Sequence, residues 1–113
     1  MELKERQARI EAEFMEARDS RAKGNEGRAR VCARRAAGIA IGIYFERNTG
    51  ESPPRSAYEL LQWYSRREEI PDNLRESAER LTVRVTPEYK LPHIQDPLED
   101  ARFIVAAILD GSI

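Results

Sequence analysis

Residues 26–47, which read EGRARVCARRAAGIAIGIYFER, decide the fold of this 113-residue chain. Cys32, Ala36, Ile39 and Ile43 recur at spacings of four, three and four, which places them on one face of an α-helix. No proline interrupts the segment, and several alanines flank the apolar stripe. The pattern predicts a long central helix against which the other elements pack.

Two glycines, Gly38 and Gly42, lie four residues apart in this segment and therefore on one helical face. A glycine inside a helix costs about 1 kcal/mol of helix propensity relative to alanine. That cost is most easily tolerated where another backbone must come close. We therefore expect a neighbouring helix at Gly38 and Gly42.

An amphipathic helix is predicted before the central one, over about residues 2–23. Leu3, Ile10, Phe14 and Ala17 occur there at helical spacing among alternating charges. A Gly-Asn pair follows and ends the segment. The two helices should therefore pack against each other in antiparallel fashion.

Capping signals mark three more helices downstream. Ser56, with Glu59 three residues later, forms a capping box ahead of a short helix. Asp72 is a suitable N-cap for the next helix. Asp96, followed by Pro97, supplies an N-cap and a proline at the first helical position of the last helix.

Residues 81–85, LTVRV, fit either the end of the fourth helix or a short strand. The helix is preferred because the 3.6-residue pattern runs into this segment. Residues 86–95 contain two prolines and are expected to form an irregular crossing. Since no convincing pair of strands is present, the chain is predicted to be an all-α, up-and-down bundle of four to five helices. A single domain would span residues 1–113.

Composition limits the class of protein further. Hydrophobic residues make up 41% and charged residues 35% of the chain, and the charged fraction exceeds the usual value of about 25%. No apolar run comes near the roughly 18 residues of a membrane span, and the first residues are charged. We therefore expect a cytoplasmic protein with no membrane contact.

The chain has one cysteine and one histidine. One cysteine cannot form an internal disulfide, and the two residues together cannot supply a zinc site of three or four Cys and His ligands. The glycines of residues 24–27 lack the length and the following Lys-Ser or Lys-Thr of a phosphate-binding loop. No metal site and no cofactor are expected.

The near-zero net charge hides a strong local pattern. Residues 18–35 contain seven Lys or Arg against two Asp or Glu, whereas the stretch from residue 88 onward contains five acidic residues against two basic ones. Arg28, Arg34 and Arg35 lie in the N-terminal part of the central helix, where they would add positive charge to its dipole, and are a candidate anion or nucleic-acid site. The alternative is that they pair with acidic residues of the first helix, Glu11, Glu13 and Glu16, or of the last helix.

Two other groups of side chains have a functional and a structural interpretation. Cys32 has no basic partner nearby in sequence and falls within the apolar stripe, so we interpret it as a core residue. Tyr44, Phe45, Trp63 and Tyr64 could offer a stacking surface for bases. Their helical spacing favours a place in the core.

Three segments carry a resemblance to a known family: residues 27–38 (GRARVCARRAAG), residues 53–61 (PPRSAYELL) and residues 96–101 (DPLEDA). In their order and spacing these segments resemble the HEPN family of small helical bundles. The resemblance implies an all-α bundle, frequent homodimerisation and a link to RNA or nucleotides. It also implies, for many members, a minimal nucleotidyltransferase partner in a toxin–antitoxin pair.

The catalytic members of that family cleave RNA with an arginine separated from a histidine by four to six residues. In this chain residues 86–88, Thr-Pro-Glu, occupy the positions that the arginine would take before His93. Arg84 lies nine residues before His93, with a proline between them. We therefore expect a non-enzymatic, dimerising binding module that contacts a nucleotide, RNA or a nucleotidyltransferase partner.

Two alternatives stay open. The first is a divergent ribonuclease of a toxin–antitoxin pair that uses His93 with Arg84 or Arg102. The second is a small accessory subunit whose apolar helix faces are completed by another protein.

Overall fold

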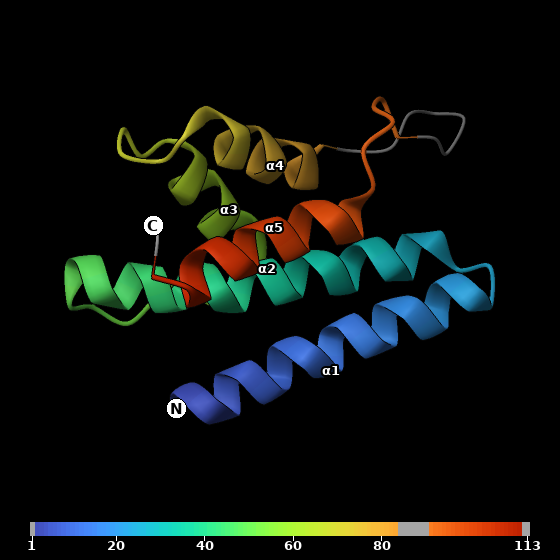
Figure 1. Cartoon of the computed structure of the whole chain (residues 1–113), viewed down its shortest axis with the longest axis horizontal. Coiled ribbons are helices and arrows are strands. Elements are labelled where there is room, and N and C mark those ends of the chain that lie inside the picture. Colours follow the sequence, from blue (N-terminus) through green and yellow to red (C-terminus); the bar gives the residue numbers. More distant parts are fainter. Residues whose placement is uncertain (1, 84–90, 112–113) are drawn as a thin grey trace.

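The computed structural model describes residues 2–83 and 91–111, and all regular secondary structure in these two ranges is helical (Figure 1). The helices are α1 (Leu3–Ala22), α2 (Glu26–Thr49), α3 (Ala57–Ser65), α4 (Asp72–Thr82) and α5 (Pro97–Leu109). The predicted all-α bundle is confirmed. None of the described helices is both long enough and apolar enough to cross a bilayer.

The central helix α2 packs against α1, α3 and α5, while α4 packs against α3 and α5. In Figure 1, α1 and α2 run antiparallel, α5 runs along α2 in the same direction, and α4 runs opposite to α5. The long helices thus alternate in direction along the chain. Helix α2 therefore lies in the middle of the bundle.

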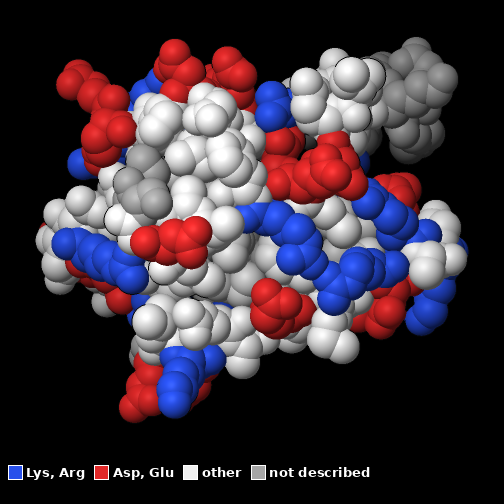
Figure 2. All heavy atoms as spheres, in the orientation of Figure 1, with Lys and Arg blue, Asp and Glu red and all other residues white. Residues whose placement is uncertain are grey.

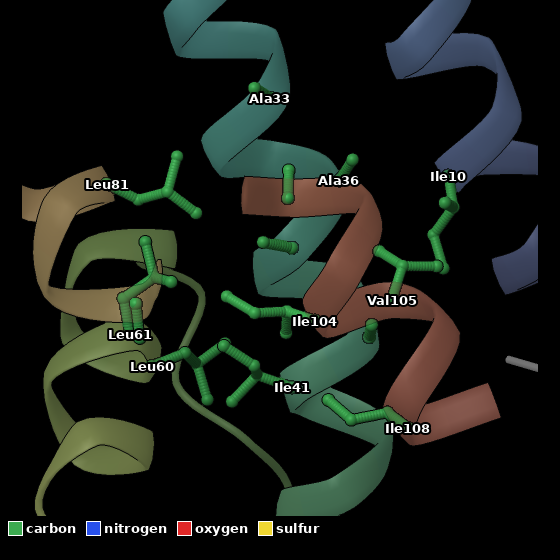
Figure 3. Close-up of a cluster of buried hydrophobic side chains, with 14 of the residues drawn as sticks. Ile10, Ala33, Ala36, Ile41, Leu60, Leu61, Leu81, Ile104, Val105 and Ile108 are labelled. Carbon is green, nitrogen blue, oxygen red and sulfur yellow. The ribbon is translucent and has the colours of Figure 1, made fainter. Parts of the chain in front are cut away.

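The core combines a row of alanines on α2 with larger apolar side chains from α2 itself and from the other helices. Ala33 and Ala36 of α2 are fully buried, and their small side chains let α1 and α5 approach the α2 backbone closely. Figure 3 shows isoleucines and leucines converging on this surface from the other helices: Ile10, Leu60, Leu61, Leu81, Ile104 and Ile108. The apolar residues predicted to face the core from α1 and α2 are buried. The exceptions are Leu3, which is 46% exposed, and Ile39, which is partly buried.

The close approach expected at Gly38 is present. A Cβ atom on Gly38 would lie 2.7 Å from the Cβ and 3.0 Å from the Cα of Ala57, the first residue of α3. At Gly42 the neighbour is Pro53 of the connecting segment, and the corresponding nearest distance is 3.5 Å. The expectation of a neighbouring helix is therefore confirmed at Gly38, whereas a loop residue takes that place at Gly42.

Two of the predicted caps are present. The Ser56 hydroxyl accepts a hydrogen bond from the backbone N–H of Glu59 at 3.2 Å. The Asp96 carboxylate accepts one from the N–H of Leu98 at 3.0 Å. These side chains satisfy N–H groups that the first turn of a helix leaves without partners.

The predicted N-cap at Asp72 is wrong. Pro71 occupies the N-cap position, and Asp72 is the first residue of α4. Its carboxylate instead accepts a hydrogen bond from the Arg75 guanidinium at 2.7 Å. Helix α4 ends at Thr82, and Val83 is extended, so the helical alternative holds for Leu81 and Thr82 while residues 84–85 lie outside the described residues.

A buried polar cluster joins α4 to α5. The Asp100 carboxylate, only 5% exposed, accepts two hydrogen bonds from the Arg80 guanidinium, at 2.8 and 2.9 Å. The Ser77 hydroxyl donates a third at 3.0 Å. A buried carboxylate needs such partners because burial removes its water. Asp100 therefore belongs to the structure of the bundle.

Candidate functional site

A groove of about 690 Å³ lies between α1, one side of α2 and the segment at residues 53–57. This volume is within the range of small-molecule sites, roughly 300–1,000 Å³. The residues that line it come from three parts of the chain: Arg6, Arg9 and Glu13; Arg35, Gly38, Ile39 and Gly42; Pro53, Pro54, Arg55, Ala57 and Leu60.

The glycines of α2 shape this groove. Because Gly38 has no side chain, the start of α3 comes within contact distance of the α2 backbone and brings residues 53–57 with it. Two consecutive prolines stiffen that segment. Apolar side chains also line the groove, namely Ile39, Pro53, Pro54 and Leu60.

Positive charge dominates the rim. Four arginines line the groove against a single acidic residue, Glu13. Arg6 forms an ion pair with Glu46 at 2.7 Å. Arg35 and Arg55 are exposed and have no carboxylate partner among the described residues. These two guanidiniums are therefore available to an anionic ligand.

The structure separates the three arginines that the sequence grouped as a candidate anion site. Arg28 donates a hydrogen bond from its Nε to the Glu16 carboxylate at 2.8 Å, so the pairing alternative is confirmed for this residue. That contact lowers the pKa of Glu16, chiefly through the hydrogen bond. Arg34 is half-buried and does not line the groove. Only Arg35 lines it.

Sequence reasoning missed Arg6, Arg9 and Arg55 as groove residues. Arg6 and Arg9 are three residues apart on α1 and so share a side of that helix. Arg55 directly follows the two prolines, the first of which, Pro53, lies against Gly42. The Pro-Pro-Arg triplet could have pointed to Arg55 as a groove residue. That inference also requires knowing that this segment packs against α2 at Gly38.

No hydrogen bond joins His93 to Arg102, the two described residues of the ribonuclease alternative. The Nδ1 atom of His93 lies 3.0 Å from the carbonyl oxygen of Gln95 in its own loop, and its Nε2 is buried without a partner among the described residues. Arg84 lies outside the described residues. The Arg102 guanidinium lies over the Phe14 ring, 4.3 Å from its centre.

Cys32 and the aromatic residues follow the structural interpretation. Cys32 is fully buried, and burial together with the charge of Glu13 raises the pKa of its thiol. Tyr44 and Tyr64 are buried and meet edge to face, with ring centres 5.5 Å apart. Trp63 is partly buried, and the Arg67 guanidinium lies 4.9 Å from its ring centre.

A second pocket, of about 380 Å³, is smaller than the groove. Figure 2 shows a run of basic side chains across the middle and right of the face that carries α5, with acidic side chains above and below it. Within residues 2–83 and 91–111, no group of three or more His, Cys, Asp or Glu side chains is placed to hold a metal ion. The arginine-lined groove is therefore the best candidate site.

No family model, curated protein or solved structure matches this chain. The function must therefore be inferred from the residues that line the groove.

Proposed function

We propose that this chain is a non-enzymatic helical binding module whose groove holds a phosphate-bearing ligand, either a nucleotide or a segment of RNA. The observation that carries the proposal is that two exposed arginines, Arg35 and Arg55, line the groove beside apolar side chains and have no carboxylate partner among the described residues. They come from α2 and from the segment before α3. A ligand between them would contact both walls.

The chemistry of the lining suits such a ligand. A guanidinium is planar, always charged and able to give two parallel hydrogen bonds to a phosphate group. The apolar base made by Ile39, Pro54 and their neighbours offers a surface for the flat face of a nucleobase. A few polar groups above an apolar base are the usual composition of a small-molecule site.

The resemblance to HEPN bundles supports the same class of ligand. With it we propose that the module forms a homodimer and associates with a nucleotidyltransferase partner. Light scattering tests the first of these, because a mass of one chain at all concentrations would remove dimerisation from the proposal. No observation among the described residues favours the ribonuclease that uses His93.

A binding titration tests the groove. Fluorescence anisotropy of labelled single-stranded RNA, with unlabelled nucleotides as competitors, is measured for the wild type and for the Arg35→Ala/Arg55→Ala double variant. The matched control is Arg18→Ala/Arg66→Ala, which removes two exposed arginines that do not line the groove.

We expect the groove variant to bind at least tenfold more weakly than the wild type, and the control to bind within about twofold of it. Two lost charge-assisted hydrogen-bond donors, at roughly 1.5–3 kcal/mol each, are sufficient for such a loss. Equal weakening in both variants would mean that net charge alone attracts RNA. The groove would then not be the site.

A further inference from the structure

A second pair of arginines, Arg30 and Arg34, lies on α2 outside the groove. The two residues are four positions apart and therefore one turn apart on the same side of the helix. Both are half-buried. Like charges at this spacing repel each other.

The other half-buried arginines of the described chain are all paired with carboxylates. The pairs are Arg6–Glu46, Arg21–Asp96, Arg67–Glu69, Arg75–Asp72 and Arg80–Asp100. Arg30 and Arg34 have no such partner among the described residues. Arg30 and Arg34 therefore differ from the other half-buried arginines, because neither has a carboxylate among the described residues to neutralise its charge.

Two features of these side chains show that burying them is unfavourable. The Nε atom of Arg30 is withdrawn from solvent and has no hydrogen-bond acceptor among the described residues. Burial, and after it the charge of Arg30, lowers the pKa of Arg34. Two like charges one helical turn apart thus lose part of their hydration without a counter-charge among the described residues.

We propose that Arg30 and Arg34 form a second anion site on α2, which takes the oxygens of a phosphate group. A phosphate has enough acceptor oxygens to receive hydrogen bonds from both guanidiniums. Its charge also offsets the repulsion between them. This site rests on the buried, unpaired Arg30 Nε and not on the groove, so the two proposals stand or fall separately.

Nuclear magnetic resonance of the wild-type protein tests the site directly. The side-chain Nε–H signals of the arginines are followed as inorganic phosphate is added, with sodium chloride at matched ionic strength as the reference. We expect the Arg30 and Arg34 signals to shift and saturate with phosphate, and the exposed Arg18 signal to stay in place. An Arg30 signal that moves no more than that of Arg18 would overturn the proposal.

A pair of variants tests the energetics. Arg30→Gln/Arg34→Gln removes both charges of the site, and Arg18→Gln/Arg66→Gln is the matched control. Ligand binding to the folded state raises Tm, so phosphate should raise the Tm of the wild type and of the control by several degrees relative to chloride. The site variant should gain clearly less, because only the groove arginines are left to bind phosphate, and in chloride it should be at least as stable as the wild type. An equal gain in all three proteins would contradict the site, and if the variant fails to fold, the wild-type spectra still decide.

Two titrations of the same protein distinguish a small phosphate from the phosphates of a nucleic-acid backbone. In one arm inorganic phosphate is added, and in the other a short single-stranded RNA. A shift of the Arg30 signal at much lower RNA than phosphate concentration assigns the site to a nucleic-acid backbone. A shift with phosphate alone assigns it to a small phosphate. A shift with neither rejects it.

Discussion

Gly38 is the residue on which the closeness of α2 and α3 depends. We expect Gly38→Ala to lower the free energy of unfolding by about 1–3 kcal/mol, the usual range for overpacking. The reason is that the new Cβ would lie 2.7 Å from the Ala57 Cβ and 3.0 Å from its Cα, and a backbone atom cannot simply rotate away. Urea unfolding followed by circular dichroism measures the change.

Gly42→Ala is the control within the same helix. Its Cβ would meet Pro53 at 3.5 Å, which is an ordinary contact. The gain in helix propensity, about 1 kcal/mol, should then make this variant as stable as the wild type or more stable. If both alanine variants were equally destabilised, the close approach at Gly38 would not be the cause.

Tyr44 and Glu69 predict a dependence of stability on pH. The Tyr44 hydroxyl donates a hydrogen bond to the Glu69 carboxylate at 2.7 Å. This bond, with help from the backbone and from Arg67, lowers the pKa of Glu69 from 4.5 to about 2. Because the folded pKa is below the unfolded one, the contribution is complete above pH 4.5 and is lost as the pH falls toward 2.

We therefore expect Tyr44→Phe to show a shallower loss of stability than the wild type between pH 4.5 and 2. The phenylalanine keeps the ring in the core but removes the donor. Thermal unfolding at several pH values measures the two slopes. Parallel curves for the two proteins would show that this hydrogen bond does not hold the Glu69 carboxylate in its charged form.

At the scale of the elements, the Asp100 carboxylate of α5 accepts hydrogen bonds from Arg80 of α4. Asp100→Asn leaves the Arg80 guanidinium without its counter-charge in a partly buried position. Breaking a buried pair by removing one partner costs roughly 3–5 kcal/mol, and we expect about 3 kcal/mol because Arg80 keeps some contact with water. Chemical denaturation measures the loss.

Glu99→Gln is the matched control for that change, since Glu99 is the exposed neighbour of Asp100 on the same helix. Its effect on stability should be within about 0.5 kcal/mol, as for most surface substitutions. A similar loss in both variants would point to the helix N-terminus and not to the contact with α4.

The helices themselves could be predicted well because their signals are local. The spacing of Ile10 and Phe14 and the caps at Ser56 and Asp96 depend on neighbours within a turn or two of the chain. The error at Asp72 is a shift of one residue at a helix start, where Pro71 takes the cap position. Asn25, which accepts a hydrogen bond from the N–H of Arg28, was assigned only to the break between helices.

At the scale of the whole molecule, the candidate site could be predicted only in part. Arg35 was among the candidate residues, but Arg6 and Arg55 join it from segments far away in sequence. Their convergence depends on how α1 and residues 53–57 pack against α2, and no local pattern encodes that arrangement. Arg28 shows the opposite error. Its position on α2 suggests an anion site, whereas in the structure it forms an ion pair with Glu16 of α1.

The salt dependence of RNA binding tests the central claim most directly. Binding through phosphates releases counterions, so the logarithm of the affinity falls linearly with the logarithm of the salt concentration. We expect the wild type to show a clear negative slope, and Arg35→Ala/Arg55→Ala to reduce its magnitude by roughly 1 to 2 while Arg18→Ala/Arg66→Ala leaves it nearly unchanged. Absence of RNA and nucleotide binding at low salt, or the same slope in the wild type and the groove variant, would contradict the assignment of the groove as the ligand site.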